Sequence, residues 1–230
     1  MTDPTPDPIQ NDSASLSFKA ETRQLLNILI HSLYKDRDVF LRELLSHASD
    51  ALNRVRFEML TEHQVLDPGV ELCVRLTMDK GQRLLTIQDT GIGMTRDEII
   101  ENLGTIAQSG ARKFMEATRE KKLDFSQVIG QFGVGFYSVF MVAEWVRVTS
   151  RSSKPRARAV SWLATGEDKY EVSPAEMTAR GTKVEIKLKE DASEFAEEFR
   201  LKEIIHKHSD YIGFPIYLGD VKEPVNKQAS

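Results

Sequence analysis

The chain has 230 residues, 40% of them apolar, so it is long enough to bury a core as one large or two small domains. Its 31 basic and 35 acidic residues give a formal net charge of −4, which provides no broad positive field for a nucleic-acid backbone. A single cysteine excludes an internal disulfide, and no segment approaches the length of a membrane span. We therefore expect a cytoplasmic protein that binds neither nucleic acid nor a membrane.

The N-terminal half begins with a segment that has almost nothing to bury. Residues 1–14 are rich in proline and in acidic or small polar side chains, so we expect a disordered extension before a single folded domain over 15–230. Apolar residues recur at helical spacing over 21–34 and 39–60, which predicts two consecutive helices. Two alternating stretches, at 70–78 and 83–89, predict a β-hairpin.

The middle of the chain, from Thr95 to about Gly135, has short helical patterns and several glycines but no long strand. This pattern is typical of a helical lid, which we place at about 102–135. The elements expected after it are helices over 136–143 and 199–210, and strands over 144–150, 157–164, 181–189 and 215–218. The fold class that follows is α+β, a two-layer sandwich with helices on one face of a mixed, mostly antiparallel sheet.

One face of the second predicted helix carries a polar stripe. Glu43, His47, Asp50 and Arg54 project within an arc of about 60°, because successive helical residues turn by about 100°. Taken alone, this stripe is most simply a solvated row of charge pairs.

Three further segments have residues that suit a ligand. The sequence DTGIGM at 89–94 follows a strand, and its glycines allow a ligand close to the backbone while the Asp89 carboxylate can accept a hydrogen bond from an amino group. An ordinary glycine turn capped by aspartate would have the same sequence. At 180–182, RGT opens a strand, and the Thr182 hydroxyl can join a polar network.

The third segment is GQFGVGF at 130–136, which precedes a helical run. Its backbone N–H groups can point at phosphate oxygens, assisted by the helix dipole. A dinucleotide fingerprint requires a different glycine order, and a P-loop would continue with lysine and serine or threonine, whereas Phe136 and Tyr137 follow Gly135 here. A glycine-rich hinge without a ligand is the remaining alternative.

In their order along the chain, the polar stripe and the segments at 89–94, 130–136 and 180–182 resemble the nucleotide site of the gyrase B, mismatch-repair, histidine-kinase and heat-shock ATPases, which share the GHKL fold. Within that group, four segments are similar to the N-terminal ATPase domain of the ninety-kilodalton heat-shock chaperones, especially bacterial ones: IHSLY at 30–34, FLREL at 40–44, LGTIA at 103–107 and IGQFGVGFYS at 129–138. The resemblance extends from about residue 18 to residue 215.

The resemblance implies that the domain binds ATP or ADP with Mg²⁺. It gives Glu43 the role of the general base that activates the attacking water, and it gives Asp89 the role of the carboxylate that receives the adenine amino group. The other implied nucleotide-binding residues are Leu44, Asp50, Ala51, Gly93, Met94, Asn102, Gly133, Val134, Gly135, Phe136 and Thr182.

Two positions depart from the family pattern. His47 stands where these chaperones have an asparagine that helps to hold magnesium, and imidazole is a poorer ligand than oxygen for that hard ion. Gln108 stands where the family often has a lysine that reaches the phosphates from the lid, so a neutral hydrogen bond would replace a charged one.

The resemblance also implies the role of the longer protein. In that role, ATP is hydrolysed slowly, and lid closure drives the folding of client proteins, with co-chaperones, in a full-length homodimer whose isolated N-terminal domain is monomeric. One alternative is a nucleotide sensor that does not hydrolyse ATP, although Glu43 would have no purpose there. Another is a gyrase-like or mismatch-repair ATPase acting on DNA, which the acidic charge and the heat-shock-type segments oppose.

Overall fold

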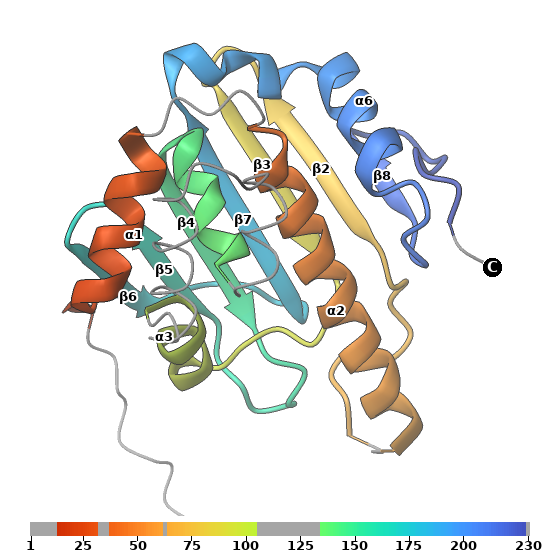
Figure 1. Cartoon of the computed structure of the whole chain (residues 1–230). Helices are drawn as coiled ribbons and strands as arrows, with labels where there is room; N and C mark the ends of the chain where they lie inside the picture. Colours follow the sequence, from red (N-terminus) through yellow and green to blue (C-terminus); the bar gives the residue numbers. More distant parts are fainter. Residues whose placement is uncertain (1–12, 32–36, 62–63, 105–133, 229–230) are drawn as a thin grey trace, which may run out of the picture.

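The structure, a computed structural model, describes residues 13–31, 37–61, 64–104 and 134–228. In this part of the chain, an eight-stranded sheet is covered on one face by helices, as Figure 1 shows. The α+β sandwich predicted from the sequence is therefore confirmed.

The sheet has the strand order β1-β6-β5-β4-β7-β3-β2-β8. Every neighbouring pair is antiparallel except β2 and β8, which are parallel. The strands are β1 (Ala14–Ser17), β2 (Val74–Asp79), β3 (Leu84–Asp89), β4 (Ala143–Arg151), β5 (Val160–Ala164), β6 (Lys169–Pro174), β7 (Gly181–Leu188) and β8 (Ile216–Leu218). The helices are α1 (Ala20–His31), α2 (Val39–Thr61), α3 (Arg96–Gly104) and α6 (Glu198–His208), with 3₁₀ helices η1 (Gly135–Met141) and η2 (Glu190–Ala196).

Helix α2 lies over β2 and β3 (Figure 1) and has one apolar face. Leu41, Leu45, Leu52 and Val55 recur at helical spacing and are completely buried in the core between the helices and the sheet. The opposite face carries the polar stripe, which leaves α2 with a buried side that fixes its position and an accessible side that can take part in chemistry.

The predicted hairpin is formed by β2 and β3, with Val74 opposite Asp89 at its open end. At the turn, Gln82 N–H donates to Asp79 Oδ1 over 2.9 Å. On its other side β3 pairs with β7, and this register puts Asp89 opposite Thr182. Two residues far apart in the sequence thus meet at the same end of the sheet.

The end of α3 is joined to the start of η1. Tyr137 Oη donates a buried hydrogen bond of 2.8 Å to the carbonyl oxygen of Leu103. Residues 105–133, which include most of the predicted lid, lie outside the described residues.

The structure differs from several sequence predictions. The helix predicted over 136–143 is the shorter 3₁₀ helix η1, and Ala143 already belongs to β4. Strands β1 and β6 were not predicted, because each is short and has few apolar residues. Since β1 begins at Ala14, the last residue of the predicted disordered extension belongs to a strand, while residues 1–12 lie outside the described residues.

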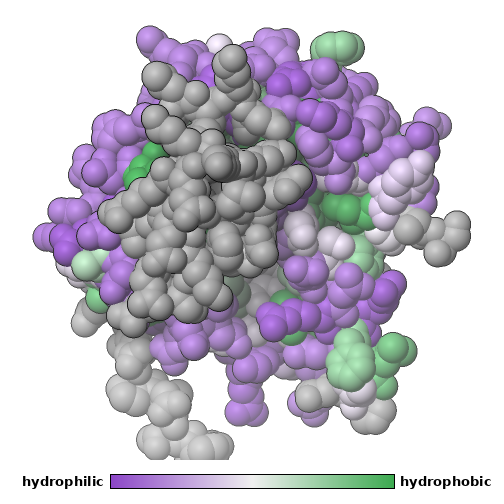
Figure 2. Space-filling view, viewed as in Figure 1, coloured by the Kyte–Doolittle hydropathy of each residue, from purple (hydrophilic) through white to green (hydrophobic). Residues whose placement is uncertain are grey.

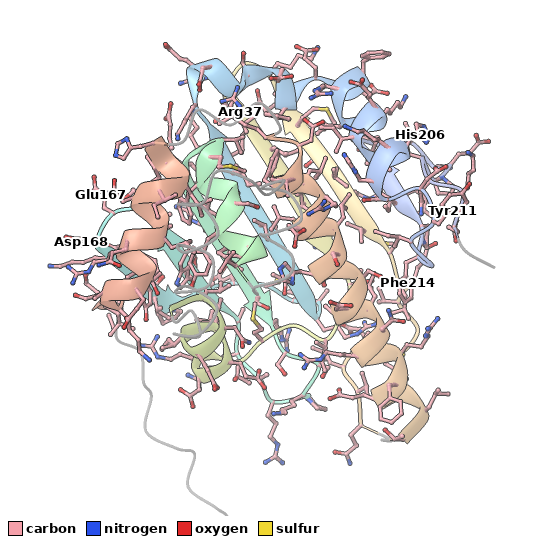
Figure 3. All side chains as sticks on the ribbon, viewed as in Figure 1. Arg37, Glu167, Asp168, His206, Tyr211 and Phe214 are labelled. Carbon is pink, nitrogen blue, oxygen red and sulfur yellow. The ribbon has the colours of Figure 1, made fainter. Side chains whose placement is uncertain are left out.

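Polar contacts lie on two opposite sides of the molecule, one beside α1 and the other at the end of α6. Figure 3 shows Glu167 and Asp168 beside α1, on the side opposite His206, Tyr211 and Phe214. On the first side Phe18 N–H donates to Asp168 O over 2.9 Å. On the second side Asp210 Oδ1 lies 3.1 Å from His206 Nδ1.

The described surface is mainly hydrophilic in the view of Figure 2. Among the exposed large apolar side chains are Phe57 and Leu60 near the end of α2, which are 66% and 82% exposed, and Phe199 on α6, which is 81% exposed. Among the described helices, none is long and apolar enough to cross a membrane.

Candidate functional site

A buried acid lies at the end of β3. Asp89 is only 7% exposed, and its Oδ1 accepts a hydrogen bond of 2.8 Å from Gly91 N–H. Burial raises the pKa of this carboxyl group to about 7, although backbone hydrogen bonds from Gly91 and Thr182 and the charge of Arg180 act in the opposite direction. A carboxylate this well enclosed is suited to one specific hydrogen-bond donor.

The turn after Asp89 is fixed to α2 at close range. Ile92 N–H donates to the Ala51 carbonyl oxygen over 3.1 Å. A Cβ atom on Gly91 would lie 2.7 Å from Ala51 Cβ, so only glycine allows this approach. Gly93 has φ +63°, and a Cβ atom there would lie 1.9 Å from the Arg151 carbonyl oxygen. The two glycines therefore hold the turn between α2 and β4.

A polar network lies next to this turn. Ser150 Oγ accepts a hydrogen bond of 2.9 Å from Met94 N–H and donates one of 3.1 Å to the Gly181 carbonyl oxygen. It also lies 2.8 Å from Thr182 Oγ1. The sequence predicted that the Thr182 hydroxyl joins a polar network but missed Ser150, whose only sequence signal is a serine at the end of an alternating stretch.

The second acid of the site, Glu43, lies on α2 eight residues before Ala51, which is about 12 Å along the helix axis. Its side chain is 12% exposed, and Arg42 donates to Oε1 through Nε at 3.1 Å and Nη2 at 2.7 Å. A Cβ atom on Gly135 would lie 2.3 Å from Oε2. The structure thus brings Glu43 together with the end of the glycine-rich segment, about two helical turns from Ala51, where the turn after Asp89 meets α2.

The remaining predicted residues on α2 lie on two sides of the helix. Leu44 is 5% exposed and belongs to the core, and Ala51 is partly buried against the glycine turn. His47 and Asp50 are exposed on the polar face. Of the predicted α2 residues, these two are the most accessible to a ligand from solvent.

Other predicted residues come from α3 and η1. Asn102 is exposed, and its Nδ2 lies 3.7 Å from Met94 Sδ. The Phe136 ring packs edge-on against Trp162, with ring centroids 5.7 Å apart, so only its backbone is available to a ligand. Val134 is buried, whereas Gln108 and Gly133 lie outside the described residues.

A metal ion would find few ligands in this part of the protein. Among the described residues there is no group of three or more His, Cys, Asp or Glu side chains that could hold one. His47 is exposed and offers nitrogen, whereas magnesium prefers oxygen. The described side chains therefore do not form a magnesium site on their own.

Comparison with known proteins identifies a family. The model of the histidine kinase-, DNA gyrase B-, and HSP90-like ATPases matches residues 46–194. This match covers α2 from its second turn, the glycine turn, the polar network and η1.

Curated relatives are similar over most of the chain. The chain is 48% identical to Chaperone protein HtpG of Chlorobium chlorochromatii over 204 residues, which are 88% of this chain and 32% of the relative. It is 46% identical to that of Coxiella burnetii over 215 residues, 93% of this chain and 34% of the relative. It is 49% identical to that of Myxococcus xanthus over 205 residues, 88% and 31%. The chain therefore spans about a third of the length of these relatives.

The buried acid makes stability depend on pH. Below pH 3.8, the ordinary value, Asp89 is protonated in both the folded and the unfolded state. As the pH rises toward 7 the unfolded state ionises first, so the free energy of unfolding falls, by about 4 kcal/mol at most, and it levels off above pH 7. Asp89→Asn should abolish this loss, and the variant should therefore be more stable than the parent protein at pH 8 but not at pH 4.

Urea unfolding of both proteins without ligand at several pH values measures this difference. Asp220→Asn, at an exposed position, is the matched control. A difference between Asp89→Asn and the parent protein that stays constant from pH 4 to pH 8 would show that Asp89 is not held in its unfavourable ionised form.

Proposed function

The chain belongs to the histidine kinase-, DNA gyrase B- and HSP90-like ATPases, whose ATPase domain it carries, and we propose that it is the part of a molecular chaperone that binds and slowly hydrolyses ATP. One observation carries this proposal. The Asp89 carboxylate is buried at the turn that packs on Ala51 of α2. Glu43 lies two turns earlier on the same helix, and its carboxylate packs against Gly135 of η1. Such a pair can receive the two ends of one nucleotide.

At the adenine end, Asp89 accepts a hydrogen bond from the 6-amino group of the base. Gly93 and the network of Ser150 and Thr182 complete the polar contacts through ordered water. Leu44, Ala51 and Met94 supply apolar contact, and Asn102 lies beside the sugar and phosphates. The burial of Asp89 and its position beside Ala51 support this orientation of the base.

At the phosphate end, the main-chain N–H groups of residues 133–136 bind the phosphate oxygens, with Gln108 as an additional neutral donor. Glu43 orients the attacking water and takes its proton. The Arg42 hydrogen bonds go to Oε1, and Oε2 is the oxygen on the side of Gly135. This geometry supports Oε2 as the proton acceptor.

Magnesium would be coordinated mainly by phosphate oxygens and water, since the described side chains offer no cluster of ligands. His47 weakens the protein's own contribution, and Asp50 supports the polar network on the same face of α2.

The longer relatives suggest a wider role, because they carry the name Chaperone protein HtpG. We propose that nucleotide binding drives closure of the lid at about 102–135 and promotes client folding in a cytoplasmic homodimer assisted by co-chaperones. The folded unit over 15–230 would be monomeric when isolated. The sensor without hydrolysis is the alternative that a test of Glu43 separates from this function.

The first test concerns the base. Asp89→Asn should lower the affinity for ADP by about five- to 150-fold, because the amide N–H₂ would face the adenine amino group, donor against donor, and an unpaired buried polar group costs about 1–3 kcal/mol. Isothermal titration calorimetry measures the affinity, and circular dichroism checks the fold. Asp220→Asn should bind ADP normally, and unchanged affinity in Asp89→Asn would remove the adenine assignment.

The second test concerns hydrolysis. Glu43→Ala should retain nucleotide binding while the rate of ATP hydrolysis falls by about two to four orders of magnitude, the usual contribution of a general base. The rate is measured in a chain long enough to include the segment that follows this domain in the relatives. Glu101→Ala, exposed on α3, is the control. Hydrolysis that persists in Glu43→Ala would require another group to activate the water.

The third test concerns residue 47. Because an asparagine offers magnesium an oxygen, ATP binding should depend more strongly on magnesium in His47→Asn than in the parent protein. ATP titrations of both proteins with and without magnesium decide this. Equal dependence in the two proteins would exclude residue 47 from the metal site.

A further inference from the structure

Arg180, directly before β7, is a buried arginine that the proposed chemistry does not use. Its side chain is 1% exposed. Nη1 donates to the Asp67 carbonyl oxygen over 2.8 Å, and the Arg180 backbone N–H lies 3.4 Å from Asp67 Oδ2. Nε and Nη2 are also buried, and they have no hydrogen-bond partner among the described residues. Burying a guanidinium with incomplete hydrogen bonding is costly, so its position requires a reason beyond packing.

The position of Arg180 connects it to the buried acid. Gly181 has φ +121°, and a Cβ atom there would lie 2.1 Å from the Asp89 carbonyl oxygen. Thr182 is opposite Asp89 in the register of β3 and β7, and its backbone N–H donates to the Asp89 side chain. Arg180 is therefore attached to the backbone segment that encloses Asp89.

The charges around Asp89 are few and come from several elements. Arg180 precedes β7, and Cys73, which precedes β2, is near enough for the charge of Asp89 to act on its thiol. Asp67, in the loop after α2, is a negative neighbour of Arg180. On α2 the charged residue next to Ala51 is Asp50, which is exposed. Among the described residues, Arg180 supplies the positive charge that favours the ionised form of Asp89.

We propose that Arg180 is a positioning residue that determines base specificity: its buried charge keeps Asp89 ionised, so that Asp89 accepts the 6-amino group of adenine and rejects a purine with a 6-oxo group. The inference rests on the proposed adenine-binding role of Asp89. Hypoxanthine presents an acceptor oxygen where adenine presents a donor. An ionised carboxylate repels that oxygen, whereas a protonated carboxyl group can donate to it.

The preference for adenine must then depend on pH. Burial raises the pKa of Asp89 to about 7, so the preference for ADP over IDP should be about tenfold or more well above pH 7 and should disappear below it. Loss of the Arg180 charge raises the pKa of Asp89 and moves the midpoint of this change to higher pH.

The test is calorimetric titration of the protein with ADP and with IDP from pH 5.5 to 9, at constant magnesium. Arg180→Met should move the midpoint to higher pH, and Arg180→Lys, which keeps the charge, should restore it. Arg180→Gln, which keeps a side-chain donor for the Asp67 carbonyl oxygen but carries no charge, should move it in the same direction as Arg180→Met. A purely structural role of Arg180 would weaken both nucleotides equally and leave the midpoint unchanged.

The outcomes distinguish this inference from the proposed function. An unchanged midpoint in Arg180→Met overturns the role of Arg180. Should Arg180→Met fail to fold, an unchanged midpoint in Arg180→Gln does the same. The Asp89→Asn variant distinguishes a failure of the Arg180 role from a failure of the adenine site. If it loses the preference for ADP while the other variants keep the parental midpoint, only the role of Arg180 fails. If Asp89→Asn keeps the preference, the adenine site itself fails and this inference fails with it.

Discussion

The contact between α2 and the glycine turn after β3 is the interaction on which the candidate site depends. The Ala51 carbonyl oxygen accepts from Ile92 N–H, and Gly91 has no side chain that would separate the two segments. This contact fixes Asp89 against the middle of the helix. Because the helix is rigid, the same contact also sets the distance to Glu43, two turns away. The same helix, α2, therefore positions both ends of the proposed nucleotide site.

The enclosure of Asp89 shows how a binding site can oppose stability. An ionised carboxylate at 7% exposure is unfavourable until a donor satisfies it, and the neighbouring N–H groups and Arg180 offset only part of that penalty. In the proposed nucleotide site, the 6-amino group of adenine would supply the missing partner. The burial that weakens the empty protein would then strengthen and orient nucleotide binding.

The sequence predicted the parts of the fold that depend on local periodicity. Helices α1 and α2 and the β2–β3 hairpin show their patterns in consecutive residues, and Asp89 stands in a recognisable glycine turn. Strand β6 was missed because Tyr170 and Val172 are its only buried residues. Ser150 and Arg180 could not be assigned a role, since their partners come from other strands and loops. Only the register of β4, β7 and β3 brings these residues to Asp89 and Thr182.

The hydrogen bond from Tyr137 Oη to the Leu103 carbonyl oxygen has a consequence for changes in chain length. It joins the residues that flank 105–133, so the main chain enters and leaves this stretch at neighbouring, buried points. The entropy of closing such a loop grows slowly with its length, by about 0.6 kcal/mol for each doubling. Insertions and deletions between the two flanks therefore have little effect on the sheet. Within α2 or β3, by contrast, a single added residue would rotate or reverse every side chain that follows. A change in chain length is therefore tolerated better by the sheet between these two flanks than within α2 or β3.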